Sequence, residues 1–309
     1  MTLENASLVT EFFLVGLTDQ SQLQIPLFLL FLVMYMITVL GNLTLIILIV
    51  LNSHLHTPMY FFLLTCPAFN LSCIDFCSSS VVTPKMLMNF IIKKNFISYV
   101  QCMTQFYFFC FFMISECYVL TSMAYDRYVA ICNPLLYNIA MSPKVCSYLI
   151  LCSYFMGISD AMIHTGCLLR VVFCGKNTIN HYFCDLLPLL QLSCTSTYAN
   201  EMEMFIVGGK NIIVPSVIIF TSYGFILSSI LQISSTEGKA KAFSTCSSHL
   251  IAVSLFFGSG TFSYLKPSSV GSVDEGKISS VFYSIVVPMI NPLIYSLRNK
   301  DVRNALIKT

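Results

Sequence analysis

Seven long apolar runs alternate with shorter polar segments along this chain. They cover residues 25–50, 59–82, 99–124, 145–166, 203–233, 242–264 and 278–297. An α-helix needs about 20 mostly apolar residues to cross the hydrocarbon core of a bilayer, and each run is long enough. The runs are continuous rather than alternating, which disfavours a membrane β-barrel. The pattern therefore predicts an all-α membrane protein, a seven-transmembrane helix bundle whose two ends lie on opposite sides.

The polar ends of the chain bear on its orientation. No repeat with a period of 20–50 residues is visible, so residues 1–309 are interpreted as one domain. The triplet Asn5-Ala6-Ser7 is a glycosylation sequon, which favours an extracellular N-terminus over residues 1–24. Residues 298–309 then form a cytoplasmic tail, and its basic, amphipathic start at 298–303 predicts a short helix on the inner leaflet. The first apolar run is expected to serve as an uncleaved signal.

Composition excludes several classes of protein. The chain is 56% hydrophobic and 10% charged, whereas a soluble domain carries about 25% charged residues. A net charge of +2 gives no electrostatic case for binding nucleic acid. The 5 histidines form no His-Glu-x-x-His pattern, so neither a metal site nor an enzyme is predicted. A small membrane transporter would usually show inverted repeats or paired broken helices, and none is visible in the sequence.

Two acids interrupt the apolar runs near their middle, Asp75 in the second and Glu116 in the third. Carboxyl groups within a membrane are costly and usually mark a function. One interpretation is a sodium or proton site that stabilises a resting state, with Asn42 and Asn291 completing its polar surroundings. The alternative is a pair of protonated, hydrogen-bonded acids that serve helix packing. Asp160 in the fourth run is interpreted as a packing or near-interface residue.

A set of motifs gives the bundle a family resemblance. Residues 123–132 read Met-Ala-Tyr-Asp-Arg-Tyr-Val-Ala-Ile-Cys at the end of the third run. Further motifs stand elsewhere along the chain: Gly41-Asn42 in the first run, Leu-His-Thr-Pro-Met-Tyr at 55–60 in the first inner loop, Ser222-Tyr223 in the fifth run, Lys-Ala-Phe-Ser-Thr-Cys-Ser-Ser-His at 241–249 at the start of the sixth, and Pro-Met-Ile-Asn-Pro-Leu-Ile-Tyr at 288–295 in the seventh. Together they resemble rhodopsin-like G-protein-coupled receptors, in the extended form typical of olfactory receptors, across essentially the whole chain.

The resemblance implies an odorant receptor of the plasma membrane, with an extracellular N-terminus. Such a receptor binds small volatile, mostly apolar molecules from outside and activates a stimulatory olfactory-type G protein, which raises cyclic AMP. Membrane lipid and trafficking accessory proteins are further implied partners, and no resident cofactor is expected beyond a possible sodium ion. A non-functional or non-olfactory chemosensory variant remains an alternative.

The resemblance also assigns roles to cysteines and to a signalling switch. Four of the 14 cysteines lie at a span end or in the long polar loop, which makes them candidates for disulfides. The resemblance pairs Cys102 with Cys184 and Cys174 with Cys194, closing a lid over the pocket. The implied switch consists of Asp126, Arg127, Tyr128, Tyr223, Asn291, Pro292 and Tyr295. Arginine at the membrane edge needs a partner and proline kinks a helix, so both suit a two-state element. The plainer interpretation of Arg127 is a side chain that snorkels to the headgroups.

The third run presents one adaptable helix face toward the expected pocket. Its members are Phe106, Phe109, Cys110, Met113, Ile114 and Cys117. A simple seam between two helices would show the same spacing. By resemblance, the residues facing them are Val207, Asn211, Phe257, Gly260, Thr261 and Tyr264. Among these, Asn211, Thr261 and Tyr264 are the expected polar anchors, and Phe257 stands where relatives often carry tyrosine.

The second run departs from the family pattern by five extra residues, 64–68. In a continuous helix, five residues add ~7.5 Å of length and ~140° of rotation. Such a rotation would turn Asp75 away from Glu116 unless the chain absorbs the excess, for which Pro67 offers a break. We expect impaired folding or surface delivery from this insertion, unless a local loop before the helix takes it up.

Overall fold

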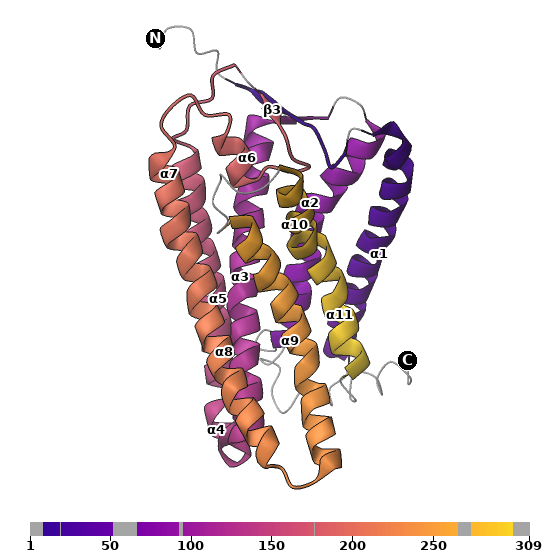
Figure 1. Ribbon diagram of the computed structural model, residues 1–309, viewed down its shortest axis with the longest axis vertical. Coiled ribbons are helices and arrows are strands. Elements are labelled where there is room, and N and C mark those ends of the chain that lie inside the picture. The colour runs from indigo at the N-terminus through magenta and orange to yellow at the C-terminus, as the bar shows by residue number, and fades with distance from the viewer. Residues whose placement is uncertain are drawn as a thin grey trace.

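The computed structural model describes residues 9–18, 20–51, 67–92, 95–175, 177–264 and 273–298. Long helices run side by side along the long axis, and three short strands gather at one end, which we call the sheet end (Figure 1). The long helices are α1 (Ser21–Leu51), α2 (Pro67–Ile91), α3 (Tyr99–Cys132), α5 (Pro143–Leu168), α8 (Gly209–Gln232), α9 (Thr236–Tyr264) and α11 (Val287–Arg298). Short helical segments lie between them: η4 (Pro134–Leu136), α4 (Tyr137–Ala140) and α6 (Leu186–Leu190).

The fifth and seventh spans of the bundle each consist of three consecutive helical segments, and we call them the fifth and the seventh column. The fifth column begins with α7 (Tyr198–Glu203) and passes through the π-helical turn η5 (Met204–Gly208) into α8. The seventh begins with α10 (Val273–Val281) and passes through the π-helical turn η6 (Phe282–Val286) into α11. A π-helical turn inserts one extra residue into the helical repeat, so it changes which positions face the bundle interior.

The distribution of polar and apolar side chains is that of a membrane protein. Six helical segments of the described chain are long and apolar enough to cross a membrane. α2 is more polar, and its Asp75, Ser78 and Thr83 are fully buried toward the bundle interior. Apolar side chains face outward instead, with Val217 58% and Phe220 77% exposed. Lipid, unlike water, stabilises an apolar exterior around buried polar groups.

α3 is the central helix and packs closely against α5. Its start is fixed by a capping box, in which Ser98 and Gln101 bond each other's backbone N–H. On α5, Gly157 lies directly against Ser115 and the backbone of Phe111. The missing side chain of this glycine is what allows the two helices to approach so closely.

A small sheet at the sheet end was not expected from the all-α pattern. β1 (Glu11–Leu14) pairs antiparallel with β2 (Phe96–Ser98) and parallel with β3 (Thr178–Ile179). Within β1, Phe12 and Leu14 alternate with more exposed neighbours and are completely or almost completely buried. Strands of two to four residues are too short to leave a periodic signal in the sequence, so the pairing emerges only from the tertiary contacts.

The structure describes the second helix from Pro67 onward, so residues 59–66 of the second apolar run lie outside the described part of the chain. Asn291 donates to both Asp75 and Glu116, so the rotation expected from five extra residues is not present in α2. The effect of the insertion on folding and surface delivery stays a prediction.

Some expected features fall outside the described residues. These are the sequon at Asn5, the motif at 55–60, insertion residues 64–66, the tail at 299–309 and the side chain of Tyr295.

Candidate ligand cavity and signalling switch

A cavity of about 120 Å³ lies between α3, α5, α9 and the η5–α8 column. From α3 it is lined by Phe106, Phe109, Cys110, Met113, Ile114 and Cys117. The opposite wall includes Asn211, Phe257, Gly260 and Tyr264. All predicted pocket residues except Val207 and Thr261 therefore meet around one space. An apolar cavity of about 150 Å³ accommodates benzene, so this one suits a small molecule.

The two exceptions have a structural cause. Val207 lies within the π-helical turn η5, where the extra residue brings Met204, Gly208 and Ile212 to the cavity wall instead. Thr261 is exposed, because the inward face of α9 runs along Phe256, Phe257, Gly260 and Tyr264. The assignments of Val207 and Thr261 to the pocket wall were therefore wrong.

The lid, residues 177–190 from β3 to the end of α6, brings a carboxylate to the cavity wall. Asp185 caps α6, and its Oδ1 accepts from the backbone N–H of Leu186 at 2.8 Å. Tyr264 donates its hydroxyl to the same oxygen at 2.9 Å. Burial raises the pKa of Asp185 to about 6. Asp185 and Leu186 were missed in the sequence because a loop residue has no helical spacing by which its facing can be inferred.

Two polar side-chain contacts join α5 to the fifth column beside the cavity. His164, which lines the cavity, lies 2.8 Å from the carboxylate of Glu203. Further along, Lys210 donates to Asp160 at 2.9 Å. Asp160 was interpreted as a packing or near-interface residue, whereas it forms one partner of a salt bridge between helices. On α3, Tyr118 donates to Asn211 at 2.9 Å and so fixes one of the predicted polar anchors.

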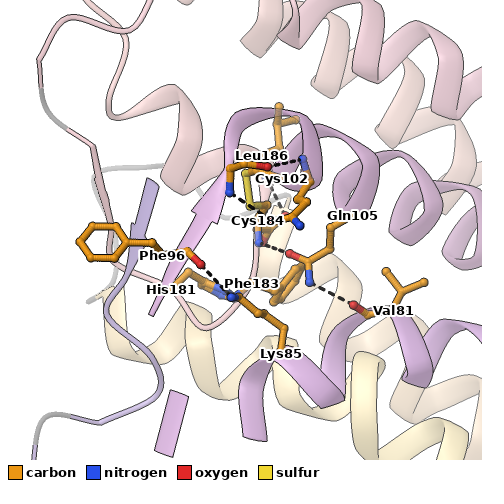
Figure 2. Close-up of a disulfide and its surroundings, with 12 residues drawn as sticks. Val81, Lys85, Phe96, Cys102, Gln105, His181, Phe183, Cys184 and Leu186 are labelled. Atoms are coloured by element: carbon orange, nitrogen blue, oxygen red, sulfur yellow. Dashed lines mark hydrogen bonds between the residues drawn. A yellow bond between two sulfur atoms is a disulfide. The ribbon is translucent and has the colours of Figure 1, made fainter. Parts of the chain in front are cut away.

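Disulfide pairing of the lid is confirmed as Cys102–Cys184, and the second bridge is Cys174–Cys194. Figure 2 shows the first bridge, with Gln105 beside it. The Gln105 side chain accepts from the backbone N–H of Cys184 at 3.0 Å and donates to the Val81 carbonyl at 3.0 Å. The lid is thus tied to α3 covalently and to α2 through one bridging side chain.

The opposite end of the bundle carries most of the predicted switch. Asp126 accepts from the hydroxyl of Tyr137 on α4 at 2.8 Å. Tyr223 on α8 contacts Nδ1 of His249 on α9 at 2.7 Å, and the charge of Arg127 acts on both. His249 lies in a motif seen in the sequence, but it was not assigned to the switch. The contact links α8 to α9 next to Arg127, so a movement of either helix would change the surroundings of Arg127.

The seventh column brings two further residues of the predicted switch into the bundle. Asn291 and Pro292 of α11 are both buried. A side chain at Gly41 of α1 would meet the ring of Pro292 at 3.1 Å, so this glycine accommodates the proline. Tyr128 packs its ring on Phe225 of α8.

Known proteins of similar sequence identify the family of this chain. A family model described as olfactory receptor matches residues 31–309. Human olfactory receptor 8B3 is 67% identical over 308 residues, covering 100% of this chain and 96% of the relative. Human olfactory receptor 8B8 is 65% identical over 308 residues, covering 100% of this chain and 97% of the relative. Mouse olfactory receptor 8B3 is 66% identical over 305 residues, covering 99% of this chain and 94% of the relative. The chain belongs to the olfactory receptor family.

Family membership confirms the resemblance and settles the class of protein. This receptor is a multi-pass membrane protein and a signalling receptor rather than an enzyme. With α2 counted beside the six apolar segments, its helices form the seven-helix bundle that the family implies.

The receptor has a buried polar cluster midway along the bundle. Asp75 and Glu116 are completely buried, and the Asn291 side chain donates to Asp75 at 3.2 Å and to Glu116 at 3.4 Å. The second oxygen of each carboxyl group has no hydrogen-bond partner among the described residues. Asn42 was expected to complete this cluster, but its amide donates to the carbonyls of Thr38 and Pro288 and so ties α1 to α11.

The lid holds two groups whose titration affects stability with opposite sign. Burial raises the pKa of Asp185 to about 6, so the folded state retains this proton more strongly and Asp185 lowers stability as pH rises from about 4 to 6. Burial and the Lys277 charge lower the pKa of His181 to about 3. His181 therefore raises stability as pH rises from about 3 to 6.5.

We expect Asp185→Asn to steepen the loss of stability on acidification. A difference of about two in pKa corresponds to about 3 kcal/mol. The free energy of unfolding of the purified variant should therefore exceed that of the wild type by up to this amount at pH 7. Near pH 4 the two should approach each other, because Asp185 is then protonated in the folded state and about half protonated in the unfolded state. The measurement is thermal unfolding in detergent from pH 4 to 7. Parallel curves for the two proteins would contradict the assignment.

Proposed function

We propose that this receptor binds small volatile, mostly apolar molecules in the cavity from the extracellular side and activates a stimulatory olfactory-type G protein, raising cyclic AMP. The observation that carries the proposal is one helix, α3, which lines the cavity at one end and bears Asp126 and Arg127 at the other. A ligand that changes the packing of α3 against α8 and α9 would alter the contacts around Arg127. The sheet end then faces the outside of the plasma membrane, with a glycosylated Asn5, and delivery there relies on trafficking accessory proteins.

The buried carboxyl pair fits a resting-state cation. Two carboxylate oxygens without partners, at Asp75 and Glu116, are the ligand type that hard cations prefer, and the unpartnered hydroxyl of Ser115 lies on the same helix as Glu116. We infer that these residues hold a sodium ion or share a proton, which offsets their burial. Asn291 of α11 would transmit the occupancy of this site to the seventh column.

We expect Arg127→Ala to lower the odorant-induced cyclic-AMP response by about 10-fold or more, because the state that engages the G protein loses its charged contact. The measurement is cyclic AMP in cells that express the receptor with a trafficking factor, normalised to surface staining. Lys144→Ala is the matched control, since Lys144 is an exposed basic residue at the start of α5. Equal responses of the two variants at equal surface levels would contradict the role given to Arg127.

A further inference from the structure

One carboxylate oxygen of Asp185 is left over for a bound molecule. Only about 5% of Asp185 is exposed, and the residue lines the cavity. Both hydrogen bonds that it accepts, from Leu186 and Tyr264, converge on Oδ1. Its Oδ2 accepts no hydrogen bond within the described residues, and this oxygen is not among the completely buried polar atoms that lack a partner. This oxygen therefore has the open space of the cavity as its neighbour.

The negative charge of Asp185 has no cationic partner among the described residues. Lys210 pairs with Asp160, and His164 lies against Glu203, so neither of these side chains is paired with Asp185. The titratable groups on which the Asp185 charge acts are one thiol and three phenols, none of them a cation: Cys110 of α3, Tyr182 of the lid, Tyr264 of α9 and Tyr283 of η6. The nearby Lys277 acts on His181, which is itself neutral. A buried carboxylate without a cation is costly, so a cationic ligand would be favoured.

The rest of the cavity defines the body of such a ligand. Phe106, Phe109 and Phe257 supply aromatic walls, and Met113 an adaptable one. Aromatic faces also attract cations. A space of about 120 Å³ restricts the ligand to a small hydrocarbon skeleton. A carboxylic acid would meet the like charge of Asp185, and an alcohol would donate a hydrogen bond without offsetting that charge.

We propose that Asp185 makes this receptor selective for small protonated amines, whose ammonium group binds Oδ2 while the hydrocarbon body fills the aromatic part of the cavity. The proposal names the ligand class of the proposed function and rests on it. Asp185 is then a specificity-determining residue supplied by the lid. Tyr264 contributes by occupying Oδ1 and so holding the carboxylate in place.

The test compares ligands that differ only in their polar group. One series is 3-methylbutan-1-amine, 3-methylbutan-1-ol and 3-methylbutanoic acid, and the second is butan-1-amine with its alcohol and acid analogues. Each compound is measured by cyclic AMP in cells and by thermal shift of the purified receptor. We expect the wild-type receptor to respond to at least one amine at about 10- to 100-fold lower concentration than to its alcohol, with no response to the acid.

Asp185→Asn separates this role from a structural one. Asparagine also caps helices and can accept from Leu186 and Tyr264, so surface level should be retained. The amine preference should fall by about 10-fold or more, while the alcohol response stays within about twofold. If the variant does not reach the surface, the wild type supplies the same test by thermal shift. Lowering the pH from 7.4 to 5 protonates Asp185, and the amine shift should shrink while the alcohol shift persists.

The outcomes distinguish this inference from the proposed function. Alcohols that act while no amine does would overturn the amine selectivity and leave the receptor function standing. An amine preference unchanged in Asp185→Asn would overturn the role of Asp185. Amine binding by thermal shift that depends on Asp185, without cyclic AMP, would uphold the inference and overturn the coupling. No response in either assay would overturn both.

Discussion

Cys102→Ser should remove most of the receptor from the cell surface. Cys102 and Cys184 are completely buried, and their bridge joins α3 to the lid across a sequence separation of 82. Loss of such a disulfide costs about 2–5 kcal/mol, a large part of the stability of a marginally stable protein. The lid would also lose the fixed position from which Cys184 donates its N–H to Gln105. The measurement is antibody staining of intact cells, divided by total expression.

The second bridge provides the comparison for this result. Cys174 and Cys194 are separated by only 20 residues, so Cys174→Ser should cost about 1 kcal/mol less in chain entropy. Cys73→Ser, at a free and half-buried cysteine, should leave surface staining nearly unchanged. Surface levels of Cys102→Ser that match those of Cys73→Ser would show that the first bridge does not hold the fold.

Gly157→Leu should disrupt the contact between α3 and α5. A Cβ at this position would collide with Ser115 Oγ and lie 2.8 Å from the carbonyl oxygen of Phe111. A hydroxyl can rotate away, but the backbone carbonyl of a packed helix cannot, so the two helices would have to separate. Overpacking of this kind costs about 1–3 kcal/mol for a methylene or two, and a leucine adds more. We expect surface staining and the melting temperature of purified receptor both to fall sharply.

Gly166→Leu is the matched control for this substitution. Gly166 lies on the same helix, is exposed, and has no atom within 4 Å of an added Cβ among the described residues. Both variants lose the same helical glycine and gain the same side chain, so only the contact with α3 differs. Comparable losses in both variants would mean that the α3–α5 approach is not what Gly157 maintains.

The sequence predicted those features that depend on one element at a time. Each apolar run is helical where the structure describes it, and the spacing along α3 correctly placed Phe106, Phe109 and Met113 on one face toward a cavity. The motif around Asp126 and Arg127 identified the family, because its order and its place at a helix end are specific. Local periodicity carries this information, since a helix repeats its faces regularly.

Features that need two distant elements could not be predicted. Tyr264 reaches Asp185 across 79 positions, and a loop residue has no periodicity to show where it faces. The π-helical turn at Met204–Gly208 moved Val207 off the cavity wall, and no residue type in that stretch signals such a turn. Asp160 could be recognised as a salt-bridge partner only once Lys210 lay beside it.

The insertion in the second run does not have the effect on Asp75 that its length predicts. Asp75 of α2 is buried in the bundle and lies in reach of Asn291, so the part of the helix that bears the carboxyl group faces the interior. The sequence identified both the excess length and the proline able to end it. Which of the two would dominate depended on the polar contacts within the bundle, because a buried carboxyl group must find its partners.

The central claim is that a ligand in this cavity activates the receptor, and two glycines of α9 test it most directly. Gly260 lines the cavity and Gly258 faces outward, and an added Cβ at either position meets no described atom within 4 Å. The measurement is the cyclic-AMP response to an odorant panel, at matched surface levels, for wild type, Gly260→Leu and Gly258→Leu. We predict that Gly260→Leu fills the cavity and loses the response, while Gly258→Leu retains it. A full response from Gly260→Leu would contradict the account, because the ligand would then bind elsewhere.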